Sequence, residues 1–156
     1  MKNMLFAVPL LVAGTVFAPA APAAEMSGVL VVTPDELKWA EVASLPPGAK
    51  VTVIEGKMDQ KGPITARLKL PADYKVPAHW HPEVERVTVL SGTFNYGVGD
   101  KLDPQMTKAL GPGSVVVMPP KTKHFVWTKE ETVIQLNVMG PWGITYVNPA
   151  DKPSKP

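Results

Sequence analysis

All three histidines of the chain lie in one pattern with a glutamate. His79 and His81 are separated by a single residue, Glu85 follows four positions after His81, and His124 comes much later. Imidazole and carboxylate ligands suit Fe, Mn, Zn, Ni or Cu, and the ligand types do not select among these metals. The pattern therefore predicts one divalent metal ion per chain, bound by His79, His81, Glu85 and His124. The chain has no cysteine, which excludes a structural zinc site with thiolate ligands.

Strand geometry explains how these residues can meet. Side chains of a strand alternate between its two faces, so His79 and His81 point to the same side. Glu85 has the same parity and returns to that face after a corner, and two valines continue it as an apolar lining: Val87 and Val89. His124 begins a later strand and reaches the site only through antiparallel pairing. The alternative is two exposed strand histidines and one buried, hydrogen-bonded histidine.

Other polar residues are candidates for catalysis beside the metal. Four protein ligands leave two positions of an octahedral metal open for water, substrate or dioxygen. An acid or base step would then use metal-bound water, Glu85, the hydroxyl of Tyr96 or another carboxylate. Arg67 would hold a carboxylate or enolate if it faced the interior, although a solvated outer face is the alternative. Gln135, or Asn137 on the same strand face, would contact the metal-bound ligand or a histidine. No organic cofactor is predicted.

The rest of the sequence predicts an all-β fold. Thr33-Pro34-Asp35-Glu36 forms a capping box with proline at the first helical position, which predicts one short helix that runs through Trp39. The β-branched, alternating segments between Pro and Gly turns suit a sandwich or barrel and not βαβ units. Strands are expected at 29–32, 51–54, 64–70, 78–81, 84–90, 93–98, 108–110, 114–118, 124–128, 132–139 and 144–147.

The N-terminal residues have the order of a secretory signal peptide. Lys2 supplies positive charge, residues 4–17 are apolar and uncharged, and residues 18–24 are small. We expect cleavage after Ala23, with Ala20 as the competing site, and a periplasmic or secreted protein. The apolar run is shorter than the roughly 18–20 residues of a spanning helix, so no stable membrane anchor is expected after processing.

The predicted organisation is therefore a signal peptide and one domain with short extensions. The signal peptide is residues 1–23, the N-terminal strand and short helix are 24–50, the β-barrel domain is 51–147, and the flexible C-terminal tail is 148–156. A single domain fits the 156-residue length. The net charge of +2 and the lack of a basic run give no indication of nucleic-acid binding.

Two segments of the chain match a known pair of motifs. The first motif reads G-x5-H-x-H-x3,4-E-x6-G, and it is matched here by Asp73, His79, His81, Glu85 and Gly92. Only the first glycine differs, and aspartate also tolerates turn conformations. The second reads G-x5-P-x-G-x2-H-x3-N and is matched at Gly113, Pro119 and His124. Lys121 replaces its second glycine and Thr128 its asparagine. In these motifs the chain resembles the cupin superfamily, and more narrowly small exported single-domain cupins with a 3-His-1-Glu metal site.

The resemblance implies a cupin-type jelly-roll barrel (double-stranded β-helix) with the metal near its centre, often in a homodimer. It also implies a range of activities that the fold does not narrow: dioxygenase, decarboxylase, isomerase, lyase or ligand binding. Our leading hypothesis is an exported metal-dependent enzyme that acts on a small oxygen-rich molecule. The alternatives are a non-catalytic periplasmic protein that binds a metal or small ligand, and a barrel in which the motif is only structural.

Overall fold

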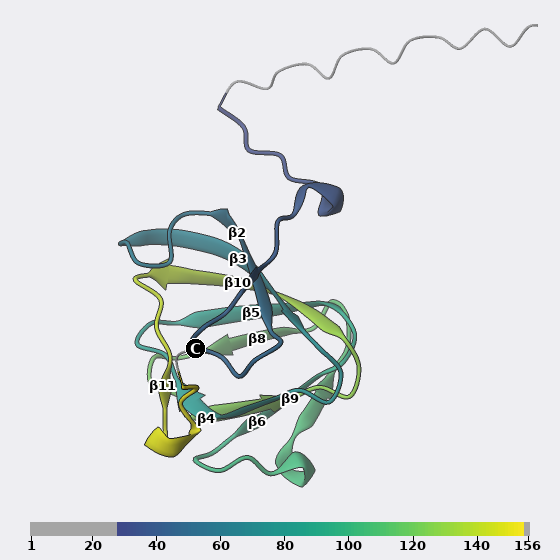
Figure 1. The fold of residues 1–156 in the computed structure, drawn as a ribbon, viewed down its shortest axis with the longest axis vertical. Helices are drawn as coiled ribbons and strands as arrows, with labels where there is room; N and C mark the ends of the chain where they lie inside the picture. The colour runs from purple at the N-terminus through teal and green to yellow at the C-terminus, as the bar shows by residue number, and fades with distance from the viewer. Residues whose placement is uncertain (1–27, 155–156) are drawn as a thin grey trace, which may run out of the picture. The chain divides into compact units, whose positions relative to one another are not determined.

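The strands form two antiparallel sheets that face one another (Figure 1). The computed structural model describes residues 28–154. One sheet has the order β1 (Ala40–Glu41), β2 (Lys50–Glu55), β3 (Gly62–Leu70), β10 (Thr132–Gly140), β5 (Glu85–Ser91), β8 (Val115–Met118). The other has the order β11 (Thr145–Tyr146), β4 (Lys75–Trp80), β9 (His124–Trp127), β6 (Phe94–Val98), β7 (Lys108–Leu110). This arrangement confirms the predicted all-β class.

Alternating side chains place the core between the two sheets. Every second residue of β3 is buried, and the residues between them are partly exposed. Strand β10 pairs with β3 over its whole length and repeats this alternation. The sheet therefore has one apolar face and one partly polar face, as expected for an antiparallel sheet that covers a core on one side. The buried residues of β3 and β10 are Ile64, Ala66, Leu68, Leu70, Thr132, Ile134, Leu136 and Val138.

The N-terminal part differs from the prediction in two ways. Residues 29–32 have no regular secondary structure, so the strand predicted there is wrong. The capping box is present, because the Glu36 carboxylate accepts bonds from the backbone N–H and the hydroxyl of Thr33. It begins only the 3-10 turn η1 (Pro34–Glu36), however, and not a helix through Trp39. The Trp39 ring instead lies 4.7 Å from Lys69 Nζ, and β1 starts at the next residue.

Four turn positions of the two sequence motifs have the left-handed backbone conformation. Gly92 has a φ of 73° and Gly113 a φ of 84°. Asp73 and Lys121, which occupy the other two usual glycine positions, have φ values of 56° and 61°. The turns are therefore kept where the glycines are lost, at the steric cost that a Cβ adds in this region.

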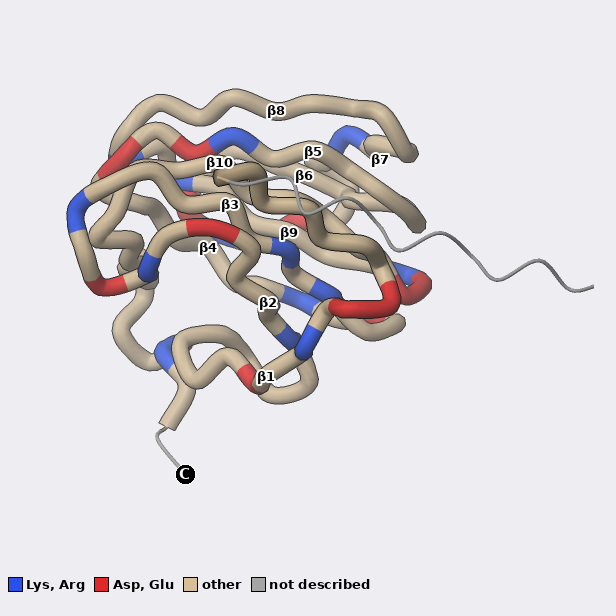
Figure 2. Tube along the Cα trace, turned by 90° about the horizontal axis from the view of Figure 1, so that it is seen from above, with Lys and Arg blue, Asp and Glu red and all other residues tan. Residues whose placement is uncertain are grey.

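Short 3-10 helices occur outside the sheets as well. η2 (Pro104–Met106) follows β6, and η3 (Pro149–Asp151) lies in the C-terminal segment that we expected to be a flexible tail. The side chain of Asn148 accepts a bond from the backbone of Ala150, which explains the local turn. No helix within residues 28–154 is long and apolar enough to cross a membrane. Basic and acidic residues are interspersed along the chain, as Figure 2 shows.

Candidate metal centre

Backbone pairing brings two of the predicted ligands together. His79 of β4 is the Cα partner of His124 at the start of β9. Strand β4 has one extra residue just before this pair, because Val76 pairs with Val126 while His79 pairs with His124. Such a bulge changes the direction of the side chains that follow it. As a result, both Val76 and His79 line the interior cavity, although their sequence positions have opposite parity.

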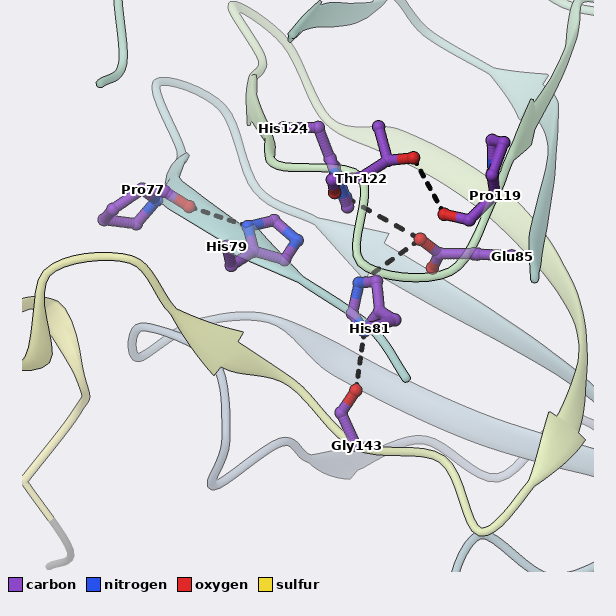
Figure 3. Close-up of polar contacts among 8 residues, drawn as sticks. All are labelled: Pro77, His79, His81, Glu85, Pro119, Thr122, His124 and Gly143. Atoms are coloured by element: carbon purple, nitrogen blue, oxygen red, sulfur yellow. Dashed lines mark hydrogen bonds and ion pairs between the residues drawn. The ribbon is translucent and has the colours of Figure 1, made fainter. Parts of the chain in front are cut away.

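His81 and Glu85 lie on either side of the corner between β4 and β5. The backbone N–H of Lys121 donates to the His81 carbonyl at 2.8 Å, which ties this corner to the β8–β9 turn. Glu85 Oε2 lies 3.2 Å from His81 Nε2 and 3.7 Å from His124 Nε2. Figure 3 shows the four side chains pointing toward one another from β4, β5 and β9. The structure thus brings together all the residues that the sequence singled out as ligands.

Each histidine is held in one tautomer by a backbone carbonyl. The Nδ1–H groups donate to the carbonyl oxygens of Pro77, Gly143 and Thr122, at distances of 2.7, 2.7 and 2.9 Å for His79, His81 and His124. Figure 3 shows the bonds of His79 and His81. A carbonyl oxygen only accepts, so the proton is on Nδ1 and the lone pair is on Nε2. A metal-binding imidazole usually has such a partner on its second nitrogen.

Burial makes all four groups neutral in the metal-free protein. It lowers the pKa of His79 well below its ordinary 6.5, and the neighbouring His124 and His81 lower it further. Burial also lowers the pKa of His81 to about 4 and lowers that of His124. It raises the pKa of Glu85 to about 8. With a pKa of about 8, the Glu85 carboxyl keeps its proton at neutral pH.

The four side chains lie in the wall of an otherwise apolar cavity of about 30 Å³. The remaining lining residues are aliphatic or aromatic, with one methionine: Leu45, Leu68, Leu70, Val76, Val87, Phe94, Met118, Val126, Ile134, Trp142 and Ile144. Val87 was predicted to line the site, whereas Val89 is buried but is not part of this lining. A cavity needs a volume of roughly 10–15 Å³ to hold one water molecule. The cavity here therefore has room for a metal ion and only a few further atoms.

Two polar candidates from the sequence lie on the other face of the first sheet. Arg67 alternates with the cavity-lining Leu68, and Gln135 alternates with Ile134. Arg67 and Gln135 are cross-strand partners, and Arg67 Nε donates to Gln135 Oε1 at 3.2 Å. Asn137 on the same face donates to the Thr65 hydroxyl. Arg67 therefore lies on the outer face of the sheet, away from the cavity, which is the second of the two positions that the sequence allowed.

Tyr96 lies beside the site without lining the cavity. Its ring centroid is 5.8 Å from that of His124, and the ring packs against the hydrophobic core. Burial, together with Glu85, raises the pKa of the Tyr96 hydroxyl. The hydroxyl stays in its neutral form at neutral pH. Tyr96 is thus a neighbour of one predicted ligand, His124.

The sequence analysis gave no role at the site to the segment that lies between β10 and β11. Trp142 stacks on His81, with ring centroids 5.0 Å apart and an interplanar angle of 20°. Gly143 supplies the carbonyl that holds His81, and Ile144 completes the cavity wall. These residues have no motif of their own, because a packing surface and a backbone carbonyl require no particular spacing. The Gly140-Pro141 turn was the sole signal near them.

The donor set fits a divalent metal ion. The three imidazoles offer nitrogen atoms that all lie within 4.8 Å of one another. Three nitrogens at about 2.1 Å from one metal lie about 3.0–3.6 Å from one another, so the imidazoles would have to move closer together on binding. The imidazoles are neutral and correctly protonated for binding. Metal binding would have to displace one proton, that of the Glu85 carboxyl.

Comparison with known proteins agrees with this geometry. Solved structures with similar folds include the polyketide cyclase RemF from Streptomyces resistomycificus (TM-score 0.61, 17% identity, covering 79% of this chain and 88% of that one). KdgF from Halomonas sp. has a TM-score of 0.54 and 19% identity, and covers 70% of this chain and 90% of its own. A chain from the Rhodobacter sphaeroides complex of SigE with the anti-sigma ChrR has a TM-score of 0.52 and 18% identity. The match covers 69% of the present chain and 52% of that chain.

Identities this low show a common fold and nothing about activity. No curated protein sequence matches this chain. A family model, however, described as the ChrR cupin-like domain, matches residues 27–142, which include both motifs and all four predicted ligands. The jelly-roll prediction is confirmed, and the chain belongs to the cupin superfamily as a member of the ChrR cupin-like family.

Proposed function

We propose that this protein is an exported metalloprotein that binds one divalent ion through His79, His81, Glu85 and His124 and acts on a small oxygen-containing molecule. The observation that carries the proposal is the set of three Nδ1–H bonds to backbone carbonyls, which leaves three Nε2 lone pairs in one buried cavity. When bound, the metal would supply Lewis-acid or redox chemistry to a ligand in its open positions.

The chain's own residues define which reactions are compatible with the site. Glu85 is the titratable carboxyl at the cavity, and burial raises its pKa to about 8 in the metal-free protein. As a metal ligand it would be ionised, so in the loaded protein it would accept a proton and not give one. The apolar walls exclude water and offer no charged group to bind a sugar or a dicarboxylate at several points. An isomerase, lyase, decarboxylase or oxygenase reaction at one or two oxygen atoms of a small substrate fits these limits.

Turnover in the metal-loaded protein tests the enzyme proposal. The purified chain would be loaded in turn with Fe, Mn, Zn, Ni and Cu and incubated with β-diketones while oxygen uptake and products are followed. Flavonols, dicarboxylates and sugar derivatives would be included as compounds that the size and apolar walls of the cavity should exclude. We expect conversion of one compound class, slowed by ~10²–10⁴-fold in Glu85→Gln, which keeps the side-chain size but loses the titrating carboxyl. No conversion with any metal would contradict an enzyme.

A binding protein is the second candidate, and the cavity size favours it. A volume of about 30 Å³ does not admit a substrate of many atoms in this conformation. The fold neighbours include both kinds of protein, since RemF is described as a polyketide cyclase and ChrR as an anti-sigma factor in complex with SigE. Tight binding of a small ligand with no chemical change, in the same screen, would support this candidate.

Export is proposed from residues 2–24, which lie outside the described part of the chain. Their charged, apolar and small-residue order supports a cleaved signal peptide. Expression of the full chain in a Gram-negative host, followed by fractionation and N-terminal sequencing, tests this. We expect a periplasmic product that begins at Ala24, whereas uncleaved protein in the cytoplasm would contradict export.

A further inference from the structure

The segment between β10 and β11 forms one wall of the metal cavity. Trp142 and Ile144 line the cavity, and the carbonyl of Gly143 accepts the Nδ1–H of His81 at 2.7 Å. The backbone N–H of Trp142 donates to the Met58 carbonyl at 2.8 Å. The segment is therefore attached both to a predicted metal ligand and to the loop after β2. These contacts hold the backbone of the segment on both sides of the Trp142 side chain.

The indole of Trp142 has a buried donor that no group within residues 28–154 satisfies. Its ring stacks on His81, with 5.0 Å between the centroids. Its Nε1 atom is inaccessible to solvent and has no hydrogen-bond partner. A buried tryptophan N–H normally finds an acceptor, because a buried donor without a partner destabilises the fold. Among the side-chain nitrogen and oxygen atoms of the described chain, this is the one buried atom in that state.

The chemistry of the cavity wall limits what the acceptor can be. Apart from the four predicted metal ligands, the polar atom that the lining side chains contribute is this indole nitrogen. The three histidine Nδ1–H groups are already bonded to carbonyls. Among the residues that line the cavity, Trp142 is therefore the one with an unpaired side-chain donor. The volume of about 30 Å³ restricts that molecule to a few atoms once a metal ion is present.

We propose that the Trp142 indole N–H donates a hydrogen bond to the exogenous ligand of the metal, and so selects small anionic or oxygen-rich ligands that have a second acceptor atom. This inference rests on the proposed metal site. Azide, hydroperoxide and a small carboxylate have the required chemistry: one atom binds the metal and another accepts from Nε1–H. A ligand with a single donor atom gains nothing from Trp142.

The affinity of azide for the cobalt-loaded protein tests the proposal. Visible absorption of Co²⁺ reports both metal binding and the entry of an anion into an open position. In Trp142→Phe, which keeps a stacking ring but loses the donor, we expect azide affinity to fall roughly tenfold, the effect of one hydrogen bond to a charged acceptor. Trp127→Phe is the matched control, because the Trp127 indole donates to the Thr107 hydroxyl at 3.2 Å and does not line the cavity.

A second measurement reports the donor itself. In the zinc-loaded protein labelled with ¹⁵N-tryptophan, azide should move the Trp142 indole N–H resonance downfield and leave that of Trp127 in place. Unchanged azide affinity in Trp142→Phe, an unmoved Trp142 resonance, or a metal-loaded wild type that binds no azide would each overturn the role of Trp142 while the metal site stands. Failure of the wild type to bind cobalt or zinc would instead overturn the proposed function.

Discussion

His79 and His124 are paired across β4 and β9, and their ring centroids lie 4.2 Å apart. Two of the predicted ligands are thus positioned by the hydrogen-bond ladder of the sheet, where a shift of one residue would turn a side chain to the other face. His81 and Glu85 come from the corner that follows β4. The site is therefore built mainly on paired strands and the corner that joins two of them.

Metal binding should release close to one proton from the protein at pH 7. The three histidines are already neutral, whereas burial holds the pKa of Glu85 at about 8, so this carboxyl must lose its proton to become a ligand. Calorimetric titration with zinc in buffers of different ionisation enthalpy measures the number of protons released per metal ion bound. Glu85→Gln should release none. Equal proton release from both proteins, or none from either, would show that Glu85 does not bind as a carboxylate.

The metal-free protein should become less stable as the pH rises from 6.5 to 8. The folded-state pKa of Glu85 is raised above its ordinary 4.5 to about 8, so the associated stability is present at low pH and is lost as pH rises through about 8. The lowered histidine pKa values act oppositely, but only below 6.5. We expect a loss of about 2 kcal/mol at most in the free energy of unfolding.

Urea denaturation at pH 6.5 and pH 8 measures this loss. Glu85→Gln serves as the control, since it cannot titrate and should show almost no change between the two pH values. Stability of the wild type that increases over this interval would mean that the folded protein stabilises an ionised Glu85.

Lys121→Gly should stabilise the protein by about 1 kcal/mol. Lys121 has a φ of 61° in the turn before His124, a conformation that costs a residue with a Cβ about 1–2 kcal/mol and costs glycine little. Lys123→Gly, two positions later and without a positive φ, should destabilise the protein. Thermal unfolding of both variants compares them, and a lower melting temperature for Lys121→Gly would show that its side chain contributes more than the strain costs.

Gly92→Ala should destabilise the protein by more than about 2 kcal/mol. A Cβ at this position would lie 2.5 Å from the Glu131 carbonyl oxygen and 2.6 Å from Thr132 Oγ1, and the φ of 73° is itself unfavourable for alanine. Gly111→Ala is the matched control, because no atom lies within 4 Å of its Cβ and its φ is not positive. Chemical denaturation that gives the same loss for both would contradict a packing requirement at Gly92.

The sequence predicted the strands well because their alternation and turn residues are local signals. Ten strands predicted after residue 50 correspond to β2 through β11, with ends that differ by a few residues at most. The failures lie where tertiary contacts decide. Residues 29–32 have strand propensity but no regular secondary structure, and the helix predicted after Thr33 is a 3-10 turn of three residues.

The candidate site was predictable only in part for the same reason. Ligand types and spacing identified the four converging side chains, and strand parity placed Val87 correctly. Parity alone did not reveal the bulge before His79, although Pro77 within a strand is a typical sign of one. Parity also could not choose the face of Arg67 and Gln135, since either face of an alternating strand can be the inner one. Trp142 contacts the site by ring packing and Gly143 by a backbone carbonyl, and neither contact requires a motif with a fixed residue spacing in the sequence.

The metal content of the purified protein tests the central claim most directly. Mature protein without a histidine tag would be compared by elemental analysis with His79→Ala/His81→Ala, with circular dichroism to confirm that both are folded. We predict close to one divalent ion per chain in the wild type and none in the double variant, because that variant loses two of the converging Nε2 donors. Equal metal content in the two proteins, or no metal in the wild type even after reconstitution, would contradict a metal centre at these residues.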